Sequence, residues 1–365
     1  MQDWLIEDEQ LSIGRKSVLP GAGFFYPDSL EEQEAEREAE ETLTGSDVVV
    51  VADPDADGLA CTALVRLVHG EGALLPAGPH ELEEALEWVA EYANPEATVY
   101  VCDLCPDSES DIDALPDAVS RLASFSWYDH HQWDDDLATQ VRETGVDLTV
   151  GESDEVCTAD VALNELDHTF DDRFEELAAV TRDHDLWIRD DERSDDLADY
   201  AYWTDPEEYV ETVLEHGVDF PAEVDEFLAE QRIEKEALIE KAIERAEMRE
   251  AGPWTIGVTY GRCSQNEVAE ALREQGSDAA VIVKPAGSAS IRGTETFERC
   301  HEVAAQVNGG GHPKAAGCKP DIYDDMLDYA HHWTTQGAVA KQAIIGAFQR
   351  LADDTETESD NASDE

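Results

Sequence analysis

The chain has 365 residues, of which 42% are hydrophobic, and this is enough for the cores of about two domains. Its 87 acidic residues outnumber the 24 lysines and arginines and give a formal net charge of −63. A charge of this size argues against general affinity for nucleic acid at low salt, and the frequent apolar segments exclude a disordered acidic chain.

The small number of lysines and the pattern of cysteines indicate the kind of organism and the cellular compartment in which the protein works. Only seven of the cations are lysines, and an acidic, lysine-poor globular chain is typical of halophilic archaea that accumulate salt. The seven cysteines include one C-x-x-C pair, Cys102 and Cys105, and the lack of a second pair argues against structural zinc. We find no signal peptide pattern and no long apolar run, so we expect a cytoplasmic protein without a membrane partner.

The first two thirds of the chain alternate between strand and helix patterns. Residues 1–44 are expected to form an N-terminal extension with an exposed helix at 31–41. Residues 45–220 then alternate, which predicts βαβ units and a doubly wound parallel sheet. We expect strands at 48–52, 98–102 and 125–128, helices at 59–68, 81–92, 159–166, 174–180 and 206–215, and a loop or short helix at 111–119.

The remaining third predicts a smaller domain behind a connector. Residues 221–250 are charged and contain no glycine or internal proline, so we expect a long helical linker. Residues 251–350 are expected to form the second α/β domain, and the acidic tail 351–365 is expected to be disordered. Within the second domain we expect strands at 255–260, 279–283 and 288–292 and a helix at 266–275.

A cluster of aspartates follows the first predicted strand. Asp53, Asp55 and Asp57 come directly after four consecutive valines and precede Gly58. Three carboxylates in one turn repel each other unless a cation neutralises them, and hard divalent cations prefer oxygen ligands. Because ligands of doubly wound sheets bind beyond the carboxyl ends of the strands, the turn predicts a divalent-cation site. The alternative is an acidic turn on a very acidic protein.

Other acids and imidazoles stand at comparable places. In a parallel sheet the carboxyl ends of the strands share one edge, where carboxylates and imidazoles together suit a pair of Mn²⁺-like ions. Two such ions can clamp a phosphoryl group and generate a hydroxide. Taken singly, each residue also has a structural explanation, such as a strand cap or a solvated acid. The residues are Asp103, Asp129, His130, His131, Asp183 and Asp185.

The second domain carries a triple glycine in an unusual charge environment. Residues 262–319 hold seven basic and seven acidic residues, so on this chain the segment is a relative basic patch. Gly309, Gly310 and Gly311 lie within it and are followed by His312. A triple glycine is usually a tight turn, but it can also bring backbone N–H groups close to a phosphate.

In combination these motifs resemble those of the DHH phosphoesterases, over residues 45–320. The resemblance rests on Asp53-x-Asp55-x-Asp57-Gly58, Asp103, Asp129-His130-His131, Asp183 and the segment 309–317, which is similar to the signature of the family's associated C-terminal domain. It implies two Mn²⁺ ions, with Mg²⁺ or Co²⁺ as alternatives, and a bridging role for Asp103. The implied metal ligands are Asp53, Asp55, Asp57, Asp103, His131 and Asp183.

The resemblance also implies roles for residues that do not bind metal. His130 is expected near the scissile phosphate, and Asp129 is expected to orient a histidine through its ring N–H. The triple glycine would bind a terminal phosphate together with Arg292 and His312. The fourth acidic motif stays ambiguous, because Asp185 could be the ligand in place of Asp183.

The implied function is a Mn²⁺-dependent phosphoesterase that hydrolyses phosphodiester bonds through a metal-activated hydroxide. Asp53 favours a RecJ-like exonuclease, with single-stranded nucleic acid or short oligonucleotides held in a cleft between the domains. The lack of room for an oligonucleotide-binding-fold domain favours an oligoribonuclease-like enzyme, or one that acts on 3′-phosphoadenosine 5′-phosphate or a cyclic dinucleotide. A catalytically idle replication subunit is the third alternative, and a homodimer or a replication or repair partner stays open.

Overall fold

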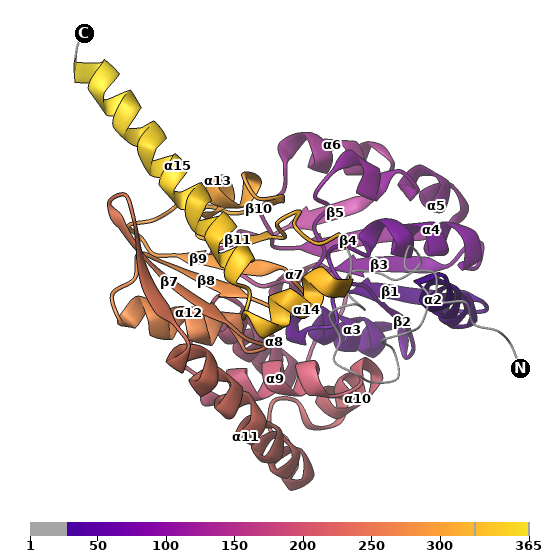
Figure 1. Cartoon of the computed structure of the whole chain (residues 1–365). Helices are drawn as coiled ribbons and strands as arrows, with labels where there is room; N and C mark the ends of the chain where they lie inside the picture. Colours follow the sequence, from indigo (N-terminus) through magenta and orange to yellow (C-terminus); the bar gives the residue numbers. More distant parts are fainter. Residues whose placement is uncertain (1–27, 325, 364–365) are drawn as a thin grey trace, which may run out of the picture. The chain divides into compact units, whose positions relative to one another are not determined.

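The structure is a computed structural model that describes residues 28–324 and 326–363 (Figure 1). Contacts between residues divide the chain into two compact units. Glu32–Gln231 form the first unit, and Arg232–Glu365 form most of the second. None of the described helices is long and apolar enough to cross a lipid bilayer.

A five-stranded parallel sheet is the centre of the first unit. Its order is β2-β1-β3-β4-β5, and every neighbouring pair is parallel. This order reverses direction between β1 and β3, so the carboxyl ends of these two strands flank the position where doubly wound sheets bind ligands. The strands are β1 (Val48–Ala52), β2 (Ala73–Pro76), β3 (Thr98–Cys102), β4 (Ser124–Asp129) and β5 (Asp147–Val150).

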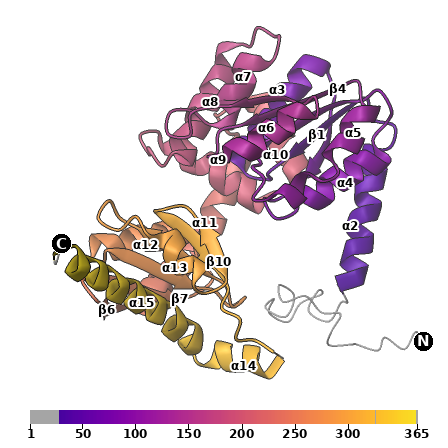
Figure 2. The same cartoon turned by 90° about the horizontal axis from the view of Figure 1, so that it is seen from above.

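Helices cover both faces of this sheet, as the sequence predicts for a doubly wound fold. Val50 of β1 packs in one core and its neighbours Val49 and Val51 pack in the other, because side chains alternate along a strand. In Figure 2, α4 and α5 lie on the opposite side of the sheet from α7 and α8. The helices of the core that contains Val50 are α3 (Ala56–His69), α7 (Thr158–Glu165), α8 (Asp172–Asp185), α9 (Glu192–Trp203) and α10 (Pro206–His216). The helices of the other core are α2 (Asp28–Leu43), α4 (Leu82–Tyr92), the short helix η2 (Glu109–Ile112), α5 (Leu115–Arg121) and α6 (Asp135–Glu143).

The second unit is built on a mixed sheet with the order β10-β11-β9-β8-β7-β6, in which only β7 and β8 are parallel. The long helix α11 (Ala222–Glu244) leads into it from the first unit. The strands are β6 (Glu247–Ala251), β7 (Trp254–Tyr260), β8 (Ala279–Val283), β9 (Ala289–Gly293), β10 (Gly309–Gly311) and β11 (Ala315–Cys318), and the helices are α12 (Gln265–Glu274), α13 (Cys300–Ala305), α14 (Met326–Thr334) and α15 (Ala338–Ser363).

Three sequence-based expectations differ from the structure. The linker helix ends at Glu244 rather than at 250, because Glu247–Ala251 pairs with β7 as an antiparallel strand. The triple glycine is an edge strand paired with β11 rather than a loop. The segment after 351 was expected to be disordered, but α15 continues to Ser363, since extending an existing helix costs less than starting one.

The turn after β1 depends on a glycine for space rather than for an unusual dihedral angle. A Cβ atom on Gly58 would lie 2.3 Å from the backbone oxygen of Asp53. We expect Gly58→Ala to lower the free energy of unfolding by about 3 kcal/mol, because the turn must move to relieve the clash. Gly72→Ala is the matched control, since its Cβ would make only ordinary contacts from 3.5 Å outward. Urea unfolding of both variants in molar KCl measures the difference, and equal stabilities would contradict the prediction.

Candidate metal centre

The aspartate turn is organised by the start of α3. Asp55 caps this helix, and its carboxylate accepts hydrogen bonds from the backbone N–H groups of Asp57 (2.9 Å) and Gly58 (3.1 Å). Asp57 lies in the first helical turn and is buried. Its two oxygens accept from the N–H groups of Thr158 (2.7 Å) and Ala159 (2.8 Å) at the start of α7. A helix N-terminus favours a carboxylate, so α7 fixes Asp57 in place.

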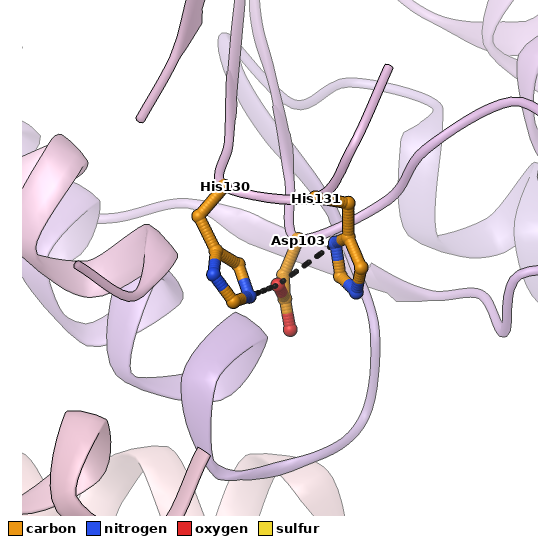
Figure 3. A group of neighbouring side chains, drawn as sticks. All are labelled: Asp103, His130 and His131. Atoms are coloured by element: carbon orange, nitrogen blue, oxygen red, sulfur yellow. Dashed lines mark ion pairs between the residues drawn. The ribbon is translucent and has the colours of Figure 1, made fainter. Parts of the chain in front are cut away.

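Asp103 lies between the imidazole rings of two histidines. It directly follows β3 with a left-handed backbone (φ 59°) and is almost fully buried. Its Oδ1 accepts a hydrogen bond from the hydroxyl of Thr158 at 2.8 Å. His130 Nε2 lies 3.7 Å and His131 Nδ1 lies 3.8 Å from the same oxygen, and Figure 3 shows the two rings on either side of the carboxylate.

Asp129, the last residue of β4, orients one of these histidines. It is fully buried, and its two oxygens contact His131 Nδ1 at 2.8 Å and Trp133 Nε1 at 2.6 Å. An ionised carboxylate only accepts hydrogen bonds, so the imidazole donates its Nδ1–H. This leaves Nε2 of His131 available to a cation, which is the usual arrangement of a metal-binding histidine backed by a carboxylate.

The two acids of the fourth motif have different surroundings. The carboxylate of Asp183 accepts the backbone N–H groups of Asp190 (3.0 Å) and Asp191 (3.2 Å) and so holds the loop that follows α8. The carboxylate of Asp185 instead reaches the cluster, where Oδ2 lies 3.2 Å from Nε2 of His130. The structure therefore brings Asp185, and not Asp183, to the other predicted ligands.

Burial and mutual repulsion raise the pKa of the clustered carboxyls. Burial and the charge of Asp55 raise the pKa of Asp53 to about 7 and that of Asp57 to about 6. Burial and the charge of Asp57 raise the pKa of Asp185 to about 8, and the same two causes raise the pKa of Asp103 well above its ordinary value. The cluster thus carries more negative charge than the fold neutralises at ordinary pH.

The pKa values of the two histidines shift in opposite directions. Burial, aided by the neighbouring His131, lowers the pKa of His130. Burial alone would also lower the pKa of His131, but the hydrogen bond and charge of Asp129 outweigh it and raise the pKa to about 9. In the neutral state, His130 can offer a ring nitrogen to a cation or to a phosphate oxygen.

The donor set of this cluster fits divalent cations. Three buried polar atoms of the cluster have no hydrogen-bond partner among the described residues, namely both ring nitrogens of His130 and Oδ2 of Asp185. Buried polar atoms are normally paired, and a cation would satisfy these. Ligand atoms of Asp103, His130 and His131 lie within 4.8 Å of one another, and so do those of a second group, Asp57, His130 and Asp185. Carboxylates with imidazole are suitable ligands for Mn²⁺.

Two residues of the site were not predicted from the sequence. Thr158 contacts both Asp57 and Asp103, and Trp133 donates to Asp129. A threonine at the start of the helix expected at 159–166 was the only signal for the first. The distance of four residues between Asp129 and Trp133 gave no signal for the second.

The predicted phosphate-binding residues belong to the second unit. Arg292 of β9 is half-buried, and its guanidinium donates to Asn266 Oδ1 at 2.9 Å and to the backbone oxygen of Ala316 at 3.4 Å. β11 lies between Arg292 and the glycine strand β10, which is exposed at the edge of the sheet. The backbone N–H of His312 is used internally, since it donates to the oxygen of Ala315 at 2.7 Å.

Comparison with known proteins supports the fold. No protein-family model and no curated protein matches the chain. Among solved structures it is similar to an exonuclease RecJ bound to manganese (TM-score 0.51, 17% identity), covering 91% of this chain and 96% of that one. It is also similar to RecJ of Thermus thermophilus in complex with Mn²⁺ (TM-score 0.52, 16% identity), with 87% of this chain and 55% of that chain covered.

A third similar structure is that of an enzyme named as specific for pGpG. The chain resembles the pGpG-specific phosphodiesterase PggH of Vibrio cholerae with a TM-score of 0.51 and 12% identity, covering 81% of this chain and 98% of that one. At these identities the similarity establishes the fold alone. The chain thus has the two-domain α/β fold of RecJ and of this phosphodiesterase.

The different surroundings of Asp183 and Asp185 predict different effects on metal binding. We expect Asp185→Asn to weaken Mn²⁺ binding by at least about tenfold, because a ligand oxygen in the cluster is lost. We expect Asp183→Asn to lower the melting temperature with a smaller effect on Mn²⁺, because the N–H groups of the following loop lose an acceptor. Isothermal titration with Mn²⁺ in molar KCl measures both variants, and the reverse order of effects would assign the ligand to Asp183.

The raised pKa of Asp185 predicts how the stability of the metal-free protein depends on pH. The folded carboxyl, with its pKa of about 8, holds a proton that the unfolded one releases near 3.8. The stability contributed by this proton is therefore lost as the pH rises through about 8. In EDTA, Asp185→Asn should lose less stability than the parent chain between about pH 5 and about pH 8. Thermal melting across this range is the measurement, and parallel curves would contradict the prediction.

Proposed function

We propose that the protein is a divalent-metal-dependent phosphoesterase that cleaves phosphodiester bonds in single-stranded nucleic acid or short oligonucleotides. The observation that carries the proposal is the group of buried Asp57 and Asp103 and half-buried Asp185 around His130, at the edge of the sheet where the strand order reverses. We assign Asp185 to the ligand set in place of Asp183. The other proposed ligands are Asp53, Asp55, Asp57, Asp103 and His131, with Asp103 between two Mn²⁺ ions.

The residues of the chain have separable roles in this proposal. Divalent cations, when bound, would supply the positive charge that polarises a phosphate ester and lowers the pKa of water. Asp129 holds the ring of His131 through the Nδ1–H, and Thr158 holds Asp57 and Asp103 at a fixed separation. Neither ring nitrogen of His130 makes a hydrogen bond among the described residues, although Nε2 lies 3.2 Å from Asp185, and one of them can meet a phosphate oxygen.

The second unit supplies groups suited to an anionic end of the substrate. The half-buried guanidinium of Arg292 and the exposed backbone of Gly309–Gly311 offer N–H donors. An edge strand presents unpaired backbone groups, and glycines without side chains let a phosphate approach them closely. We propose that these groups and His312 bind the terminal phosphate.

A small-nucleotide phosphodiesterase is the second candidate function. It is supported by the similarity to the pGpG-specific enzyme, of which 98% is covered, although coverage does not separate the candidates, since the manganese-bound RecJ is covered to 96%. Turnover measured against substrate length separates the two candidates. Rates that increase from dinucleotides to longer strands favour the exonuclease, and rates confined to dinucleotides, 3′-phosphoadenosine 5′-phosphate or cyclic dinucleotides favour the small-nucleotide enzyme.

Removing the central carboxylate tests the proposed activity. We expect Asp103→Asn to lower Mn²⁺-dependent hydrolysis at least about a hundredfold, because several kcal/mol of charge stabilisation depend on the cations it would bridge. Asp113→Asn replaces an exposed acid away from the cluster and should retain full activity. The assay uses Mn²⁺ in molar KCl with labelled oligonucleotides, dinucleotides and cyclic dinucleotides. If the parent chain hydrolyses none of them, the proposed function is wrong and a binding role remains.

A further inference from the structure

The second unit contains a pocket that the proposed metal chemistry does not use. Its volume is about 270 Å³, and the residues around it come from the end of α11, the end of β7 and α14. Most of its surface is apolar, and cations and aromatic rings stand on its walls. The principal lining residues are Leu238, Lys241, Arg245, Tyr260, Arg262 and Trp333.

Three of these residues are cations for which the described part of the chain provides no carboxylate partner. Among the described residues, no ion pair involves Lys241, Arg245 or Arg262. Neighbouring cations in the same unit are paired, as Lys235 is with Glu267 and as Arg249 is with Glu247. On a chain with 87 acidic and 24 basic residues, three such cations around one pocket mark a site for negative charge.

A fourth cation, Lys341, lies close enough to Arg245 of the pocket for their charges to interact. Lys341 is partly buried, and burial together with the positive charges of Arg245 and Arg249 lowers its pKa, which Glu247 only partly opposes. Arg245 also lies close enough to Tyr260 to oppose the effect of burial on the pKa of that phenol. Arg245 therefore lies near both Lys341 and the aromatic ring of Tyr260.

The aromatic wall is held in place by hydrogen bonds and packing. Trp333 donates its indole N–H to the backbone oxygen of Pro285 at 2.9 Å. The adjacent His332 packs edge-on against Tyr260 with ring centroids 5.5 Å apart, and its ring nitrogens contact Tyr323 and the backbone of Lys284. These contacts fix both rings before any ligand arrives, so a flat group can bind without a large ordering cost.

We propose that this pocket binds one nucleotide, with its base against Trp333 and Tyr260 and its phosphates at Lys241, Arg245 and Arg262. Bases of every type stack on aromatic side chains, and arginine is suited to phosphate through its planar set of donors. The pocket is distinct from the metal centre, whose residues all belong to the first unit. The proposal deepens the proposed function and rests on it only for the choice of a nucleotide.

The test separates binding from hydrolysis. Fluorescence anisotropy of a labelled single-stranded oligonucleotide in EDTA measures affinity without turnover. Trp333→Ala should weaken binding about tenfold, and Trp333→Phe, which retains a ring, should retain most of the affinity. Arg245→Gln and Arg262→Gln should each weaken binding and lower the slope of log affinity against log salt by about 0.7. Arg350→Gln, an exposed cation on α15, is the control and should bind normally.

The outcomes distinguish the pocket from the catalytic proposal. Normal affinity of Trp333→Ala, Arg245→Gln and Arg262→Gln in EDTA would overturn the pocket assignment, while Mn²⁺-dependent hydrolysis by the parent chain would leave the proposed function intact. If these variants bind more weakly and the parent chain hydrolyses none of the substrates, the pocket assignment stands and the proposed enzymatic function is wrong. An Asp103→Asn variant that binds normally in EDTA but does not hydrolyse would support both.

Discussion

The proposed metal centre depends on the contacts that Thr158 makes with two buried carboxylates. Its backbone N–H donates to Asp57 and its hydroxyl donates to Asp103, so one residue at the start of α7 spans the ends of two structural elements. These donors hold the oxygens in place but do not neutralise their charge. The fold therefore fixes the positions of these carboxylate oxygens, and the repulsion between their charges persists unless a cation binds.

The same arrangement explains why the site costs stability when no cation is bound. Buried or half-buried carboxyls whose pKa rises to between about 6 and about 8 must either keep a proton or carry an unneutralised charge. Both states disfavour the folded metal-free chain near neutral pH. The proposed affinity for a divalent cation and the instability expected without one thus have a single cause, which is the burial of several acids in one small volume.

The strands were predictable, and the orientation of some site residues was not. Val48–Ala52 and Thr98–Cys102 were predicted with correct bounds, because buried parallel strands are continuous runs of β-branched and apolar residues. The helix expected at 174–180 extends to Asp185, so Asp183 and Asp185 share it. Two positions on a helix differ by about 200°, and therefore only one of these acids can face the cluster. Because the sequence alone did not show where this helix ends, it could not decide whether Asp183 or Asp185 faces the cluster.

Tertiary pairing accounts for the other differences. Glu247–Ala251 has the composition of a helix but becomes β6, because the adjacent strand β7 offers it a hydrogen-bonding partner. The triple glycine suggests a turn when taken alone, yet β11 extends it as an edge strand. Both cases depend on residues distant from the local pattern, which a sequence window does not contain.

The candidate metal centre has residues at two helix ends of opposite polarity. The amino end of α7 points N–H groups at Asp57, whereas Asp185 is the final residue of α8, where the backbone carbonyls carry partial negative charge. A cation near Asp185 would gain from that negative end, and a cation near Asp57 would compete with the N–H groups for the same oxygens. The two sides of the cluster are therefore electrically unequal, and a cation would be held more weakly beside Asp57 than beside Asp185.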